Sequence, residues 1–256
     1  MGFYNSIWVT SVPRTGSMWT RNVVKEIFTQ SNFNTYPKQQ IQSDIETLNY
    51  FNKNALHDQN INNRYVFKVH SKISNLLRSK IIFNIRNPYE VCASQYQFMK
   101  CKLDEAIKTA RFSFKFLDFY SNKKIELLII NFEDIENKPV EIIKKISFFC
   151  ETEISEEKIL LIDQKFKKEN IKKIIHSNDY KIKKKVMNKE FINQNDIVKI
   201  NKDFYRSFDA ETGFQTNHIS KKNNKNWKKL FSNSDIDKIV DILDPIVIKL
   251  GYKSEK

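Results

Sequence analysis

A short polar and basic segment near the N-terminus has the residue types that bind phosphate. It occupies residues 13–17 (PRTGS), between an apolar run that predicts a strand over about 7–12 and a pattern that predicts a helix over about 18–30. Free N–H groups at the start of such a helix can bind an anion. Gly16 lets the chain pass close to that anion, and Arg14 adds positive charge. This predicts a phosphate loop, although the same residue types also occur in ordinary turns and helix caps.

A second basic residue follows another apolar run. Residues 80–85 are almost continuously apolar, which is typical of a strand buried on both faces, and Arg86 comes directly after them. Pro88 favours the first turn of a helix over about 88–99, and Ser94 lies about two turns along that helix. A guanidinium at the end of a strand can bind phosphate oxygens in a bidentate manner. The alternative interpretation is a surface arginine before an ordinary proline-started helix.

Lys68 and His70 form a third candidate pair. They lie two residues apart on or beside a predicted strand over about 65–69, so their side chains point to the same face. This spacing suits a charged pair that shares one pocket. The other three histidines of the chain have no such neighbour, and we assign them no role.

Together, these segments resemble the signatures of the sulfotransferases that use 3′-phosphoadenosine 5′-phosphosulfate (PAPS), of the cytosolic or bacterial type. Residues 11–19 (SVPRTGSMW) resemble the family's phosphosulfate loop, Ser/Thr-x-Pro-Lys-Ser-Gly-Thr-Thr-Trp. Residues 86–94 resemble the family's Arg-Asn-Pro-x-Asp-x-x-x-Ser, with Glu90 in place of the aspartate. Residues 67–70 (FKVH) resemble the family's Phe-Lys-Thr-His segment.

The resemblance implies a sulfotransferase with PAPS as co-substrate and no metal. His70 is then the base that takes the proton of a hydroxyl or amine acceptor, while Lys68 and Arg14 stabilise the charge that develops during transfer. The acceptor is expected to be a small molecule or a glycan. The residues expected to bind the co-substrate are Arg14, Thr15, Gly16, Ser17, Met18, Trp19 (against the adenine), Thr20, Arg86 and Ser94 (on the 3′-phosphate), Lys221 and Lys222.

Three departures from the family pattern bear on this expectation. Arg14 replaces a lysine, so that a planar guanidinium stands in place of a compact ammonium. Met18 replaces a threonine and removes a hydroxyl. Residues 220–228 match the family's closing segment only in a lysine and in Trp227, without its two glycines and leading arginine. A solvated lysine-rich loop is therefore an alternative interpretation for Lys221 and its neighbour.

Composition leaves two other functions open. The chain has 44 basic and 30 acidic residues, a formal net charge of +14, which permits a non-catalytic protein that binds anions or nucleic acid. The lysines are scattered and no nucleic-acid fold signature accompanies them, so we expect no nucleic-acid partner. A P-loop-like nucleotide-binding kinase is the other alternative. The absence of a G-K-[ST] sequence after the loop counts against it.

Alternating apolar strands and helices predict a three-layer α/β/α fold with a central parallel sheet. The resemblance implies that this fold is the P-loop NTPase-like fold of the sulfotransferases. We expect one domain over 1–256, with an irregular acceptor-side and lid region over about 151–233 and a closing helix over 234–250. Three cysteines without a C-x-x-C pair, together with the lack of a leader or a long apolar stretch, predict a cytoplasmic protein without a membrane segment. The sequence does not indicate an oligomeric state.

Overall fold

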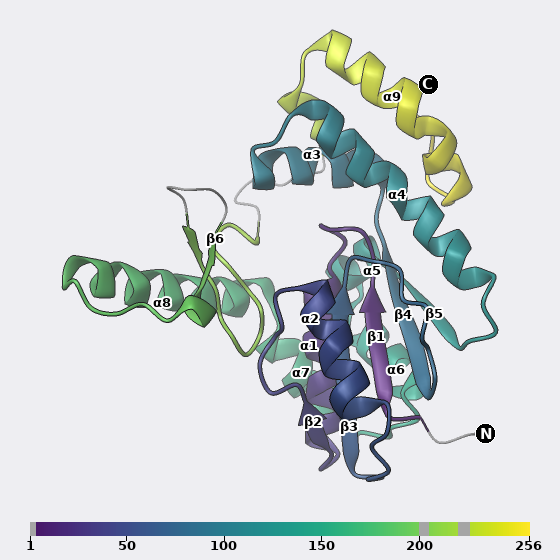
Figure 1. The fold of residues 1–256 in the computed structure, drawn as a ribbon. Helices are drawn as coiled ribbons and strands as arrows, with labels where there is room; N and C mark the ends of the chain where they lie inside the picture. The colour runs from purple at the N-terminus through teal and green to yellow at the C-terminus, as the bar shows by residue number, and fades with distance from the viewer. Residues whose placement is uncertain (1–3, 200–204, 220–225) are drawn as a thin grey trace. The chain divides into compact units, whose positions relative to one another are not determined.

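A computed structural model describes residues 4–199, 205–219 and 226–256 (Figure 1). The chain divides into two compact units, each made of segments that are far apart in the sequence. Unit 1 consists of Met1–Ser17, Lys68–Lys138 and Ser220–Lys256, and unit 2 of Met18–Phe67 and Pro139–Ile219.

Three parallel strands form the sheet of unit 1: β1 (Ser6–Thr10), β4 (Ser79–Ile85) and β5 (Leu127–Asn131). Strand β4 lies in the middle and pairs with both of the others. All five residues of β1 and all but the first of β4 are buried, as expected for parallel strands covered on both faces. Because parallel strands end at the same edge of a sheet, the segments that follow β1 and β4 lie next to each other.

Helices α3 (Pro88–Met99), α4 (Leu103–Ser121) and α9 (Asn233–Lys249) pack together in unit 1 (Figure 1). Asn87 caps α3 by accepting a hydrogen bond from the Tyr89 N–H, and Pro88 occupies its first turn. Tyr89 stacks on Trp227, with ring centroids 5.0 Å apart, in a short 3₁₀ turn over Trp227–Leu230. Helix α5 (Phe132–Asn137) directly follows β5.

Unit 2 holds the remaining elements. Strands β2 (Asn34–Tyr36) and β3 (Asn63–Val69) pair in parallel, and β6 (Ile197–Lys199) and β7 (Tyr205–Ser207) pair antiparallel. The last two residues of β3 belong to unit 1. The helices of unit 2 are α1 (Ser17–Gln30), α2 (Asp44–Tyr50, continued by a π-helical turn over Phe51–Ala55), α6 (Pro139–Phe149), α7 (Glu156–Lys165) and α8 (Lys168–Met187). The first residue of α1 is the last residue of the first segment of unit 1, and a 3₁₀ turn covers Gln194–Asp196.

The structure confirms the predicted strands over 7–12, 65–69 and 80–85 and the predicted helices over 18–30, 88–99 and 234–250, to within a few residues. Within 151–233, where we expected an irregular acceptor-side and lid region, the described residues include α7, α8 and the β6–β7 pair. The acceptor-side and lid role of this region stays a prediction. Helix α8 was hard to predict because only Ile171 and Ile175 are buried along its 20 residues. The single domain over 1–256 stays a prediction. Within the described ranges, no helix is long and apolar enough to cross a membrane.

Candidate active site

The loop between β1 and α1 is shaped by two residues in the left-handed region. Arg14 has φ +73° and Gly16 has φ +84°. A Cβ atom at Gly16 would lie 3.0 Å from Cδ2 of Phe132 and 3.1 Å from Cδ1 of Ile135, so the position requires glycine for space as well as for conformation. Thr15 folds the loop onto itself, because its hydroxyl donates to the Val12 carbonyl at 3.0 Å.

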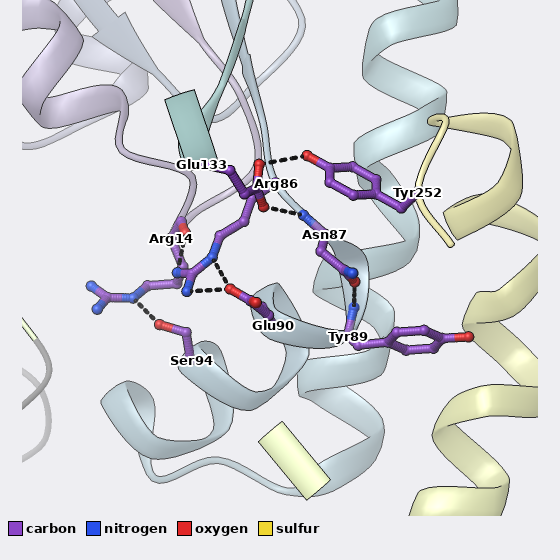
Figure 2. Close-up of polar contacts among 8 residues, drawn as sticks. All are labelled: Arg14, Arg86, Asn87, Tyr89, Glu90, Ser94, Glu133 and Tyr252. Atoms are coloured by element: carbon purple, nitrogen blue, oxygen red, sulfur yellow. Dashed lines mark hydrogen bonds and ion pairs between the residues drawn. The ribbon is translucent and has the colours of Figure 1, made fainter. Parts of the chain in front are cut away.

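Three of the predicted phosphate ligands meet beside this loop (Figure 2). The Arg14 Nε donates to the Ser94 Oγ at 3.0 Å, and the Arg86 Nη1 donates to the Arg14 backbone carbonyl at 3.1 Å. The Arg14 guanidinium also lies over the Phe98 ring, 4.0 Å from its centroid. Two guanidinium groups and a hydroxyl from separate segments of the sequence are thereby brought together.

A carboxylate and an aromatic ring hold Arg86 in place. Its Nε and Nη2 donate to the same Glu90 oxygen, at 3.1 and 2.8 Å, and its guanidinium lies 4.1 Å from the centroid of the Phe132 ring. The side chain is buried, with 8% of the residue exposed. Glu90 lies four residues further on, in the first turn of α3. Glu90 belongs to the sequence motif, but no sequence pattern indicates its pairing with Arg86 or the contact of Arg86 with Phe132.

Glu133 fixes the segment that carries Arg86. One carboxylate oxygen accepts a hydrogen bond from the Asn87 N–H at 3.3 Å, and the other accepts from the Tyr252 hydroxyl at 2.9 Å (Figure 2). Burial and the nearby Glu133 charge raise the pKa of Tyr252, so this hydroxyl stays a donor. No sequence pattern marks Tyr252, because it is 119 positions away from its partner.

His70 lies where β3 ends, and its ring is held by the phosphate-loop backbone. The Nδ1 lies 2.8 Å from the Ser11 carbonyl. Since a carbonyl can only accept, Nδ1 carries the hydrogen and Nε2 has the lone pair in the neutral ring. Burial, followed by the positive charges of Lys68 and Arg14, lowers the pKa of His70 to about 3, although the hydrogen bond to Ser11 opposes this. The ring is therefore neutral at pH 7.

The end of β1 carries two further polar groups. The hydroxyls of Thr10 and Ser11 are buried and have no hydrogen-bond partner among the described residues. Buried hydroxyls without partners are costly, and a bound anion with water could satisfy them. With Arg14, Arg86 and Ser94 nearby, this donor set fits a phosphorylated ligand. In the described part of the chain, no group of three or more histidine, cysteine or carboxylate side chains is placed to hold a metal ion.

The predicted ligands Met18, Trp19 and Thr20 lie in the first turn of α1. Trp19 and Thr20 belong to α1 in unit 2 and are buried. Met18 packs against Gly213, where a Cβ atom would come within 2.6 Å of the Met18 Cε. Lys221 and Lys222 lie outside the described residues.

Comparisons with known proteins agree with these observations. The model of the family described as sulfotransferase domain matches residues 5–251. The amine sulfotransferase of Oryctolagus cuniculus is 26% identical over 197 residues, which cover 68% of this chain and 65% of that protein. The chain thus matches just under two thirds of the length of this relative.

Two solved structures show the same fold. The structure of retinol dehydratase with androsterone and the inactive cofactor PAP (3′-phosphoadenosine 5′-phosphate) has a TM-score of 0.60 and 14% identity, over 94% of this chain and 80% of that one. The structure of mouse sulfotransferase SULT7A1 with PAP has a TM-score of 0.59 and 14% identity, over 96% and 85%. These likenesses confirm the predicted α/β fold with a mostly parallel central sheet flanked by helices.

Proposed function

This chain belongs to the sulfotransferase family, and on that premise we propose that it transfers the sulfuryl group of PAPS to a hydroxyl or amine acceptor. The observation that carries the proposal is the meeting of Arg14, Arg86 and Ser94 beside a glycine-containing loop at the ends of β1 and β4. A guanidinium pair of this kind suits a ligand with several phosphate oxygens.

PAPS supplies an activated sulfuryl group, and the chain's own residues bind and orient it. Arg86 and Ser94 hold the 3′-phosphate, and the loop from Arg14 to Thr20 holds the 5′-phosphosulfate, with Trp19 against the adenine. PAP in the two similar structures supports a co-substrate of this type. Glu90 orients the Arg86 guanidinium before the ligand binds. A phosphate at Arg86 then competes with Glu90 for the Nε and Nη2 edge of that guanidinium.

Proton transfer is assigned to the Nε2 of His70. As the acceptor oxygen or nitrogen bonds to sulfur and the bond from sulfur to the phosphate oxygen breaks, Nε2 takes the acceptor's proton. Arg14 and Lys68 stabilise the negative charge that grows on the departing phosphate. Such transfers have loose transition states, so positioning and electrostatics contribute most of the rate. Binding of an anionic ligand next to His70 raises its pKa from about 3 and makes it a better base.

The acceptor is proposed to be a small molecule. One relative is named an amine sulfotransferase, and retinol dehydratase has been solved with androsterone and with retinol. Both hydroxyl and amine acceptors are therefore candidates for this chain.

Calorimetric titration with PAP, in the absence of magnesium, tests the assignment. We expect binding that requires the 3′-phosphate, so that ATP and adenosine 5′-phosphate bind much more weakly. Arg86→Ala should weaken PAP binding by about 30-fold or more, because a buried ionic contact is lost. Arg111→Ala, at an exposed position of α4, is the matched control. Binding without preference for the 3′-phosphate would overturn the proposal and favour a magnesium-dependent nucleotide enzyme.

A further inference from the structure

Unit 2 contains a cavity that the proposed reaction does not use. Its volume is about 810 Å³, and it is lined by one face of α1, by α8 and by the turn over residues 208–212. This size suits an organic molecule, since small-molecule sites measure about 300–1,000 Å³. None of the residues assigned above to PAPS binding or to proton transfer lines it.

The wall of the cavity is firmly built. The Arg21 Nη1 donates to the Glu211 carbonyl and the Asn22 Nδ2 to the Thr212 carbonyl, both at 2.8 Å. Within the turn, the Thr212 N–H and hydroxyl both donate to one Asp209 oxygen at 2.7 Å. These contacts fix the turn against α1, so the cavity is a feature of the folded unit.

Positive charge gathers around this wall. Five lysines line the cavity, and two of them are paired: Lys165 with Glu26 at 2.7 Å and Lys185 with Asp196 at 3.6 Å. In the described residues the other three lysines form no ion pair; they are Lys25, Lys38 and Lys181.

A buried arginine adds to this positive charge. Arg21 is fully buried, and its Nε and Nη2 have no hydrogen-bond partner among the described residues. Two carboxylates face these four cations: Glu211, whose charge acts on Lys25 and Arg21, and Asp209, whose charge acts on Lys181. Positive groups are therefore in excess.

The lowered pKa of Lys25 agrees with this excess of positive charge. Its ammonium donates to the Lys38 carbonyl at 2.6 Å. Burial, then the charge of Arg21, lowers its pKa to about 8; Lys38 and Lys165 also lower it, while Glu211 raises it. An anion placed beside Lys25 would relieve this repulsion.

We propose that this cavity binds an organic anion, whose phosphate or carboxylate lies among Lys25, Lys38 and Lys181. Its apolar part lies along Phe166, Ile182 and Phe208, which also line the cavity. The ligand is thus an amphiphilic acid that binds without displacing PAP from its site.

Labelling with pyridoxal 5′-phosphate tests the proposal, because this probe carries both a phosphate and an aldehyde. The neutral Lys25 amine attacks the aldehyde, forms a C=N bond and releases water, and added borohydride delivers hydride to the imine carbon. The reaction is run on the full chain with saturating PAP, and peptide mass mapping locates the label. We expect Lys25 to be labelled about tenfold or more faster than exposed lysines, because more of its amine is neutral.

Variants and competitors make the test specific. Lys181→Gln should slow the labelling of Lys25 severalfold, whereas Lys172→Gln, at an exposed position of the same helix, should not. Phenyl phosphate or benzoate should protect Lys25 and benzyl alcohol should not; the stronger protector identifies the anionic group. Three results would each overturn the proposal: labelling of Lys25 no faster than that of the surface lysines, equal protection by benzyl alcohol, or labelling that occurs without PAP but is lost with saturating PAP.

Discussion

Arginines build the site in unit 1 and lysines line the cavity in unit 2, and the two kinds of cation are held differently. Arg14 and Arg86 each lie over an aromatic ring and each donate to fixed partners. Lys38 and Lys181 are exposed and have no ion pair in the described structure, although the Lys38 ammonium lies 4.9 Å from the centroid of the Tyr36 ring. A planar guanidinium held in this way recognises the geometry of its ligand, whereas an ammonium acts mainly as a point charge. We therefore expect strict ligand selection in unit 1 and tolerant selection in unit 2.

Each of the two regions contains a nitrogen group whose pKa is lowered. Burial is the main cause that lowers the pKa of His70 to about 3 and that of Lys25 to about 8, and neighbouring cations add to it in both cases. Each region thereby favours an uncharged nitrogen next to positive charges. The difference is that the His70 ring is held by a hydrogen bond to the Ser11 carbonyl, which makes Nε2 the nitrogen that carries the lone pair in the neutral ring.

The largest expected effect separates catalysis from binding. His70→Gln should lower kcat by about 10²–10⁴-fold, because the positioned base is lost. PAP affinity, measured by calorimetry, should change little. His176→Gln, at an exposed position of α8, is the control. A variant that sulfates an acceptor at nearly the unchanged rate would remove His70 from the mechanism.

The second prediction tests geometry against charge. Arg86→Lys keeps the positive charge but cannot bind the phosphate with two parallel N–H groups, and it loses the Glu90 contact that orients the side chain, so PAP affinity should fall by about 30-fold. Lys181→Arg in unit 2 should leave PAP affinity, and protection of Lys25 by phenyl phosphate, within about twofold of the unchanged protein. If Arg86→Lys binds PAP as well as the unchanged protein does, the contrast between the two regions is wrong.

Glycines in the two regions allow a third comparison. Gly16 and Gly213 have positive φ and close neighbours, whereas Gly251 has positive φ and no atom within 4 Å of an added Cβ. Substitution of each by alanine should lower the free energy of unfolding by about 1–2 kcal/mol from backbone strain alone. Gly16→Ala and Gly213→Ala should lose about 1 kcal/mol more than Gly251→Ala, because neighbours must shift. Urea denaturation measures the difference, and equal losses would mean that the close packing is unimportant.

A fourth prediction concerns acid stability. Because His70 has a pKa of about 3 when folded and an ordinary value of 6.5 when unfolded, the unfolded state binds an extra proton between these values. Stability therefore falls as pH drops from 6.5 toward 3, by at most about 1.4 kcal/mol per pH unit from this residue. His70→Gln should show a shallower decline in urea denaturation at pH 6, 5 and 4. Identical slopes would show that His70 is not buried as a neutral ring.

Much of the fold could be predicted because its signals are local. Apolar runs predicted β1 and β4, and Pro88 predicted the start of α3, since these features depend only on neighbours in the sequence. Strand β2, with three residues, and α5, with six, are too short to show a clear period.

The site divides in the same way. Arg14, Arg86 and His70 were found through motifs of adjacent residues. The partners that hold them were not: Phe98 and Tyr252 lie far away in the sequence and carry no distinctive pattern. Tertiary packing alone brings such partners together, and this also explains why the lysine-lined cavity was missed.

The contact between Met18 and Gly213 has an evolutionary consequence. The methionine fills the space that a side chain at position 213 would need, so the two positions are not free to vary independently. A small hydroxyl residue at position 18 would remove the nearest of these contacts, whereas Gln40 Cγ at 2.9 Å and the φ of +72° still favour glycine at 213. Homologous sequences that lack glycine at 213 should therefore have a residue smaller than methionine at 18.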